Sequence, residues 1–152
     1  MENFKNIDFN GRTFRLNKMN ALTASYMLTK LMKILSPIVK HINLEDDNLD
    51  KLDLGSLNLT EMASSLLDLE EKDFRYIQDN VLKVIQEVLP GGQPFILNKY
   101  GEFEALNVSY DIELIMNLTV KGLWFNFEGF FKENLLASLT KRLNISQQNL
   151  KI

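Results

Sequence analysis

The sequence predicts a mainly helical α+β fold, a compact bundle of about four helices with two small β-hairpins. Apolar residues recur at alternating steps of three and four in 21–42 and 74–88, and 112–131 is apolar on nearly all sides. Both patterns are typical of helices that pack together. Short apolar segments flank Asn10-Gly11 and 98–102, which is the pattern of hairpins.

The chain has the size and composition of one folded domain. Its 152 residues are 45% apolar and 24% charged, which is close to the average of globular proteins. We expect a single helical domain over 1–143. Residues 144–152 are polar and have no capping residue, so we expect them to form a flexible C-terminal tail.

The first hairpin is predicted near the N-terminus, over residues 3–16. Asn10-Gly11 is its expected turn, because both residues accept the positive φ of a type I′ turn. Apolar side chains lie on both sides of the turn, at Phe4, Ile7, Phe9, Phe14 and Leu16.

The first long helix is predicted from Ala21 to Ile42. Asn20 is its expected N-cap, because a short amide side chain can accept a hydrogen bond from the first turn. Pro37 removes one backbone hydrogen bond, so a kink or an end of the helix is expected there. The apolar positions form a heptad seam, which fits self-association and packing within one chain equally well. They are Ala21, Ala24, Leu28, Leu31, Leu35, Ile38 and Ile42.

The acidic segment 43–56 is predicted to be a loop. From Asp46 onward it resembles the start of a calcium loop, in which alternating oxygen ligands surround one cation. Lys51 and Leu57 occupy the positions where such a loop requires glycine and glutamate. We therefore interpret the segment as a solvated acidic loop.

Two helices are expected after this loop. The first is short, over about 60–67, with Thr60 as its cap. Asp68 and Glu71 have the spacing of a capping box, so they predict the start of a longer helix. Pro90-Gly91-Gly92 is expected to end that helix.

A second hairpin, with its turn at 98–102, is predicted to lead into the last long helix. Either Ser109 or Asp111 is its expected cap. Most of this helix is expected to be buried, because its polar residues fall four apart and form one thin stripe. The stripe consists of Glu113, Asn117 and Lys121.

The sequence points to no catalytic, cofactor-binding or metal-binding residues, and we expect a protein that is not an enzyme. The chain has no cysteine, which excludes disulfides and thiolate chemistry. His41 is the only histidine, so paired-histidine metal motifs are excluded as well. We interpret His41 as a packing or capping residue.

Composition also restricts the partners. A net charge of -3 argues against nucleic acid, because non-specific binding to phosphates needs a basic surface. The most apolar stretch, 112–131, is interrupted by charged and amide side chains, so neither a membrane span nor a membrane partner is expected. Residues 1–6 lack the pattern of a signal peptide, so we expect the chain to stay in the cytoplasm.

Five aromatic residues crowd into one short segment of the last helix. On a helix they point around most of its circumference, so one core cannot easily bury them all. One interpretation is that they bind a partner protein. The other is that they close the core against the aromatic residues of the first hairpin. The five are Trp124, Phe125, Phe127, Phe130 and Phe131.

The layout of residues 4–131 resembles the tail assembly chaperones of long-tailed bacteriophages. The order and spacing of several pieces carry this resemblance, together with a small hairpin. They are Phe14-x-Leu16 before Asn20-Ala21, a long helix reaching Leu35-x-Pro37-Ile38, a helix from about Tyr76 to Val88, and a helix with Trp124 that ends in Gly129-Phe130-Phe131.

The resemblance implies a non-enzymatic chaperone. Such a protein binds the phage tape measure protein, keeps it soluble and helps to bring tail-tube subunits to it. It acts in the cytoplasm of the host bacterium and is absent from the mature virion. Many families of this kind also make a longer form by frameshifting. The alternative is a structural subunit of a phage tail or of another assembly.

Overall fold

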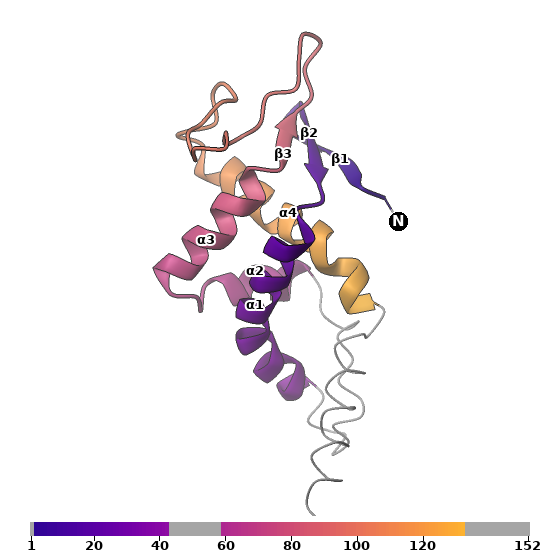
Figure 1. Ribbon diagram of the computed structural model, residues 1–152, viewed down its shortest axis with the longest axis vertical. Coiled ribbons are helices and arrows are strands. Elements are labelled where there is room, and N and C mark those ends of the chain that lie inside the picture. Colours follow the sequence, from indigo (N-terminus) through magenta and orange to yellow (C-terminus); the bar gives the residue numbers. More distant parts are fainter. Residues whose placement is uncertain (1, 43–58, 133–152) are drawn as a thin grey trace, which may run out of the picture.

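The computed structural model describes residues 2–42 and 59–132, with side chains described over 2–33 and 59–130. It confirms a mainly helical α+β fold (Figure 1). The predicted acidic loop, its comparison with a calcium loop and the C-terminal tail all lie outside the described residues. The described elements are β1 (Phe4–Phe9), β2 (Arg12–Asn17), α1 (Ala21–Ile42), α2 (Leu59–Leu66), α3 (Glu71–Leu82), β3 (Ile85–Glu87) and α4 (Ile112–Lys132).

The first hairpin is confirmed. β1 and β2 pair antiparallel, with Ile7 opposite Phe14, and the turn residues Asn10 and Gly11 have φ values of 50° and 79°. Those positive values are what a type I′ turn requires. Phe14 and Leu16 point from the same face of β2 into the core and are fully or almost fully buried.

The prediction that the third helix runs to Val88 is wrong. α3 ends at Leu82, and Ile85–Glu87 forms β3, which pairs antiparallel with β2. Val84, Ile85 and Val88 are β-branched, and Ile85 and Glu87 alternate inward with the half-exposed Gln86 between them. Pairing with the open edge of β2 therefore outweighs the helical spacing. Gly91-Gly92 lies in a turn after β3 and does not end a helix.

α1 starts as predicted. The amide of Leu22 donates to the side-chain oxygen of Asn20 over 2.9 Å, so Asn20 is the N-cap. The helix continues past Pro37 to Ile42, so the expected end at the proline does not occur. Met27 and Leu31 are fully buried, whereas Leu28 of the predicted seam is only partly buried. The buried face is thus rotated slightly from the predicted one.

Two of the predicted caps in the middle of the chain are wrong. α2 begins at Leu59, so Thr60 lies inside the helix. α3 has Glu70 as its N-cap residue with no side-chain cap hydrogen bond, so Asp68 does not form a capping box. At α4, in contrast, Asp111 caps the helix by accepting a hydrogen bond from the amide of Leu114 over 3.0 Å.

The second hairpin is short. Its turn is closed by a hydrogen bond from the amide of Asn98 to the carbonyl of Glu102, and Leu97 and Phe103 form one isolated antiparallel bridge. The amide of Ala105 then donates to the carbonyl of Phe95. These bonds fix a tight loop that carries the chain from the sheet to α4.

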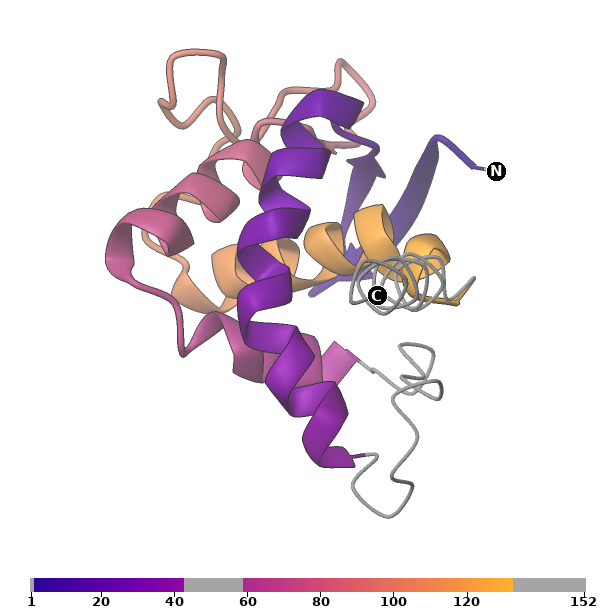
Figure 2. The ribbon, with the colours of Figure 1, turned by 60° about the horizontal axis from the view of Figure 1, so that its bottom comes forward.

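α4 is the helix around which the core is built. It packs against α2, α3 and β2, and Figure 2 shows it crossing the molecule behind α1. The close approach to α3 and β3 is made at Gly122, where a Cβ atom would lie 2.7 Å from Val81 and 2.9 Å from Ile85. A side chain at this point of α4 would therefore force the side chains of Val81 and Ile85 to shift.

Candidate functional site

An apolar groove of about 540 Å³ lies between α2 and α4. Leu59, Ala63 and Leu67 line one wall, and because they fall four apart they share one side of α2 and its continuation. Met116 and Val120 line the facing wall on α4. The groove therefore presents mostly hydrocarbon to whatever enters it.

A second hollow, of about 240 Å³, continues the first. Both are lined by Leu59 and Lys121, so they adjoin along α4. Ile7 of β1 and Trp124 and Phe125 of α4 add apolar surface to the second hollow. We call the two hollows together the α4 groove.

The polar stripe predicted for the last helix lies in this groove. Glu113, Asn117 and Lys121 all line its first hollow. The side-chain oxygen of Asn117 is buried and has no hydrogen-bond partner among the described residues. A buried acceptor without a donor costs about 1–3 kcal/mol. The fold therefore tolerates a polar group here that does not contribute to its own stability.

Lysines surround the second hollow. Lys5 and Lys121 line it, with Glu128 as the acidic residue of the wall. Lys18 lies close by, because its ammonium group donates to the carbonyl of Phe125 and sits 4.2 Å from the centre of that ring. Burial lowers the pKa of Lys18, against the opposing effect of Glu128. This end of the α4 groove is therefore basic.

The structure separates the five predicted aromatic residues. Phe125 and Phe127 are buried in the core, with 6% and 4% of their surface exposed. Trp124 and Phe130 are half-buried and pack against that core. Phe131 belongs to α4, but its side chain lies outside the described residues. Trp124 and Phe125 are the members that line the α4 groove.

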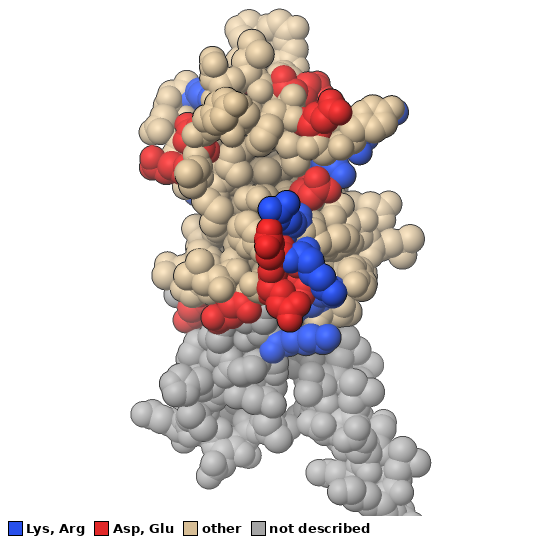
Figure 3. All heavy atoms as spheres, turned by 90° about the vertical axis from the view of Figure 1, so that its left-hand side faces the viewer, with Lys and Arg blue, Asp and Glu red and all other residues tan. Residues whose placement is uncertain are grey.

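A second exposed apolar surface was missed by the sequence reasoning. The loop 98–111 and the first residue of α4 hold large apolar side chains in solvent, with Leu106, Tyr110 and Ile112 exposed by 78%, 98% and 80%. Acidic residues accompany them, including Glu102 and Glu104. Figure 3 shows this side of the molecule, where the upper surface is mostly uncharged and broken by acidic groups.

Buried side chains and hydrogen bonds from Arg12 fix the backbone of this loop on the core. Val108 is fully buried, and Ala105 is 6% exposed. The guanidinium group of Arg12 donates to the carbonyls of Leu106 and Asn107 over 2.9 and 3.2 Å. The exposed side chains therefore stand on an ordered backbone, which reduces the entropy lost when a partner binds. No local signal in the sequence marks this surface, because Leu106, Val108, Tyr110 and Ile112 alternate with polar residues as they would in a half-buried strand.

The described residues include neither a candidate metal site nor a membrane-spanning helix. Among the side chains described over 2–33 and 59–130, no group of three or more acidic or histidine residues is placed to hold a metal ion. No helix within the described ranges 2–42 and 59–132 is long and apolar enough to cross a membrane.

An open apolar groove and an ordered, exposed apolar loop are surfaces of the kind that proteins use to bind other proteins. The family model described as phage tail assembly chaperone protein, TAC, matches residues 10–139. The chain belongs to this family, as the resemblance predicted, and its partners are therefore phage tail proteins. No curated protein and no solved structure matches the chain.

Proposed function

We propose that this chain is a non-enzymatic chaperone that binds the phage tape measure protein in the α4 groove. It acts in the cytoplasm of the host bacterium and leaves before the virion is complete. The observation that carries this proposal is the continuous apolar groove along α4, which is formed by α2, β1 and α4 together. Membership of the tail assembly chaperone family supports it.

The α4 groove has the form that an amphipathic helix requires. From Glu113 to Glu128 it follows α4 for about 22 Å, which is the length of roughly four helical turns. Peptide helices commonly dock by laying their apolar face into such a groove. The flexible side chain of Met116 lets the wall adapt to different apolar residues.

This mode of binding accounts for a chaperone activity. A long helical protein without its final partners exposes apolar stripes, and exposed stripes of this kind lead to aggregation. A chaperone that covers each stripe with a groove removes that surface from water. Several copies bound along one tape measure protein then keep it soluble until the tube forms.

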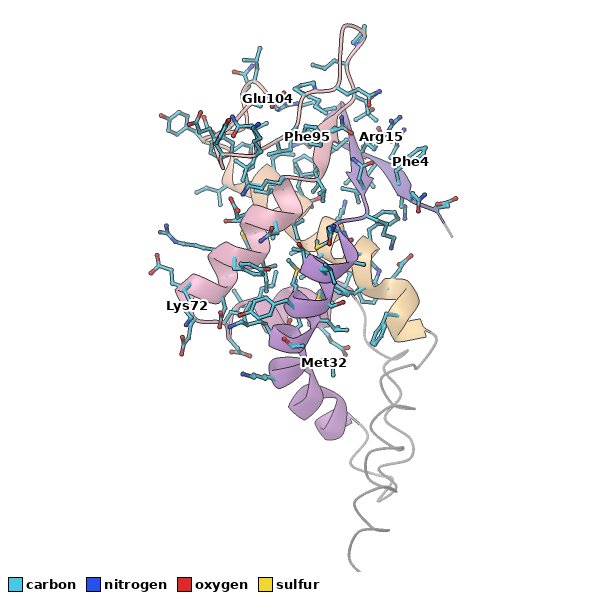
Figure 4. All side chains as sticks on the ribbon, in the orientation of Figure 1. Phe4, Arg15, Met32, Lys72, Phe95 and Glu104 are labelled. Atoms are coloured by element: carbon cyan, nitrogen blue, oxygen red, sulfur yellow. The ribbon has the colours of Figure 1, made fainter. Side chains whose placement is uncertain are left out.

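The exposed loop around Leu106 and Tyr110 is the proposed contact for tail-tube subunits. This loop lies apart from the first hairpin. Figure 4 shows Glu104 of the loop on one side of the upper part of the molecule and Phe4 of the hairpin on the other. Tyrosine and leucine on an ordered backbone are suited to form the centre of an interface. Two separate surfaces allow one chaperone to hold the tape measure protein and a tube subunit together.

Co-expression with the tape measure protein tests the proposal. Ser64 is exposed and lines the groove, so Ser64→Trp blocks the groove without emptying the core. Lys72→Trp places the same side chain on the exposed outer face of α3, away from the groove. The unmodified chain and Lys72→Trp should keep the tape measure protein soluble and co-purify with it. Ser64→Trp should do neither, while keeping the same melting temperature.

Two results would count against the proposal. If the unmodified chain does not co-purify with a soluble tape measure protein, the partner is wrong. If purified virions contain the chain at stoichiometric levels, it is a structural subunit of the tail and not a chaperone that leaves.

A further inference from the structure

We infer that the α4 groove selects its occupant by charge, and that it prefers an amphipathic helix with a basic residue near one end and an acidic residue about two turns away. This inference rests on the proposed function, because it concerns the same groove. It adds the feature by which the groove distinguishes its own partner helix from other amphipathic helices.

Opposite charges line the two ends of the first hollow of the α4 groove. At one end Glu113 lines the wall, two residues after the exposed Asp111. At the other end, where the second hollow begins, Lys121 lines both hollows. Lys5 lines the second hollow, and Lys18 lies close by. Glu128 also lines the second hollow, and its single negative charge leaves an excess of positive charge there. No ion pair within the described residues occupies Glu113, Lys5 or Lys121.

The spacing of these charges matches a helix. Glu113 and Lys121 are separated by eight residues of α4, which corresponds to a rise of about 12 Å. An occupant helix along the groove therefore meets them with side chains about two turns apart. Asn117 stands midway, and its buried oxygen has no donor among the described residues. A polar side chain halfway along the edge of the occupant fits this position.

Charge is the feature that can discriminate here. The hydrocarbon walls accept the apolar face of any amphipathic helix, since the hydrophobic effect is not directional. Complementary charges on the rim add orientation and reject helices whose charges face like charges. For partly exposed pairs, the replacement of attraction by repulsion changes affinity on the order of tenfold.

Trp124 provides a direct readout. It is the only tryptophan of the chain and lines the groove, so its fluorescence reports on occupancy. The probes are two synthetic amphipathic peptides of about 16 residues without tryptophan. Both have the same composition. The bipolar peptide carries Lys and Glu two turns apart on the edge of its apolar face, and the mixed peptide carries them together in the middle.

The bipolar peptide should bind on the order of tenfold more tightly than the mixed one, and the preference should vanish at high salt. Glu113→Lys should abolish the preference for the bipolar peptide and leave the affinity for the mixed peptide unchanged. The matched control Glu71→Lys changes an exposed residue of α3 outside the groove and should leave the preference intact.

Equal affinity of the two peptides for the unmodified chain would overturn the charge inference and leave groove binding in place. If Trp124 fluorescence responds to neither peptide, the groove does not accept helices of this kind and the inference also fails. If the chain still forms a soluble complex with the tape measure protein, the chaperone function stands but uses a surface other than the α4 groove; if no complex forms either, the proposed function fails as well.

Discussion

The guanidinium group of Arg12 donates two hydrogen bonds to the carboxylate of Glu87. Nε lies 2.6 Å from Oε2, and Nη2 lies 3.0 Å from Oε1. Glu87 is a charged residue in the core, at 4% exposure. The same guanidinium group also holds the carbonyls of Leu106 and Asn107. One side chain thus neutralises a buried carboxylate of β3 and fixes the loop that exposes the second apolar surface.

Arg12→Ala should lower the free energy of unfolding by about 2–3 kcal/mol, because it leaves the Glu87 carboxylate buried without its cation. Urea denaturation measures this loss. The control Arg75→Ala removes an exposed ion pair with Glu71 and should cost less than about 1 kcal/mol. Equal losses in the two variants would show that the Arg12 pair does not anchor the fold.

Two glycines of α4 should respond to alanine in opposite directions. Gly122→Ala places a methyl group 2.7 Å from Val81, so we expect a loss of about 1–3 kcal/mol. Gly129→Ala meets no atom of the described residues within 4 Å and should stabilise the helix by up to about 1 kcal/mol. Thermal unfolding followed by circular dichroism compares them. A stabilising Gly122→Ala would contradict the packing of α4 on α3.

Asn117→Leu should raise the melting temperature, because it removes a buried oxygen that has no donor among the described residues and adds apolar surface to the groove wall. The gain in unfolding free energy should be about 1 kcal/mol. Thr119→Val is the matched control on the same helix. Its hydroxyl donates to the carbonyl of Ile115 and accepts from Gln78, so this variant should gain nothing. A destabilised Asn117→Leu would mean that the amide supports the fold.

The aromatic residues of α4 should separate into two groups. Phe127→Ala should cost about 3–5 kcal/mol, because the ring is buried in the core. Trp124→Ala should lower stability less and weaken capture of the tape measure protein more, since Trp124 lines the groove. Denaturation and co-purification measure the two effects. If both variants lose stability and capture in equal proportion, Trp124 belongs to the core alone.

Local signals predicted the parts of the fold that depend on neighbours in sequence. The turn at Asn10-Gly11 and the caps at Asn20 and Asp111 are set by the chemistry of single side chains, and all three are confirmed. β3 could not be predicted in this way. Its residues repeat at helical spacing, and the reason for their extended form is the edge of β2, which lies far away in the sequence.

The candidate site was predicted only in outline. The stripe of Glu113, Asn117 and Lys121 was visible on α4, but only the position of α2 turns it into the rim of a groove. Phe127 could not be assigned to the core from its spacing, because burial depends on which elements pack around the helix. The loop at Tyr110 went unnoticed for the same reason, since nothing local shows that it is left uncovered.

Site-specific photocrosslinking tests the central claim most directly. A photoreactive residue replaces Ser64 in the groove or Lys72 on the outer face of α3, and each variant is co-expressed with the tape measure protein. We predict crosslinks to the tape measure protein from position 64 and none from position 72. A complex that forms normally but crosslinks only from position 72, or from neither position, would contradict binding in the α4 groove.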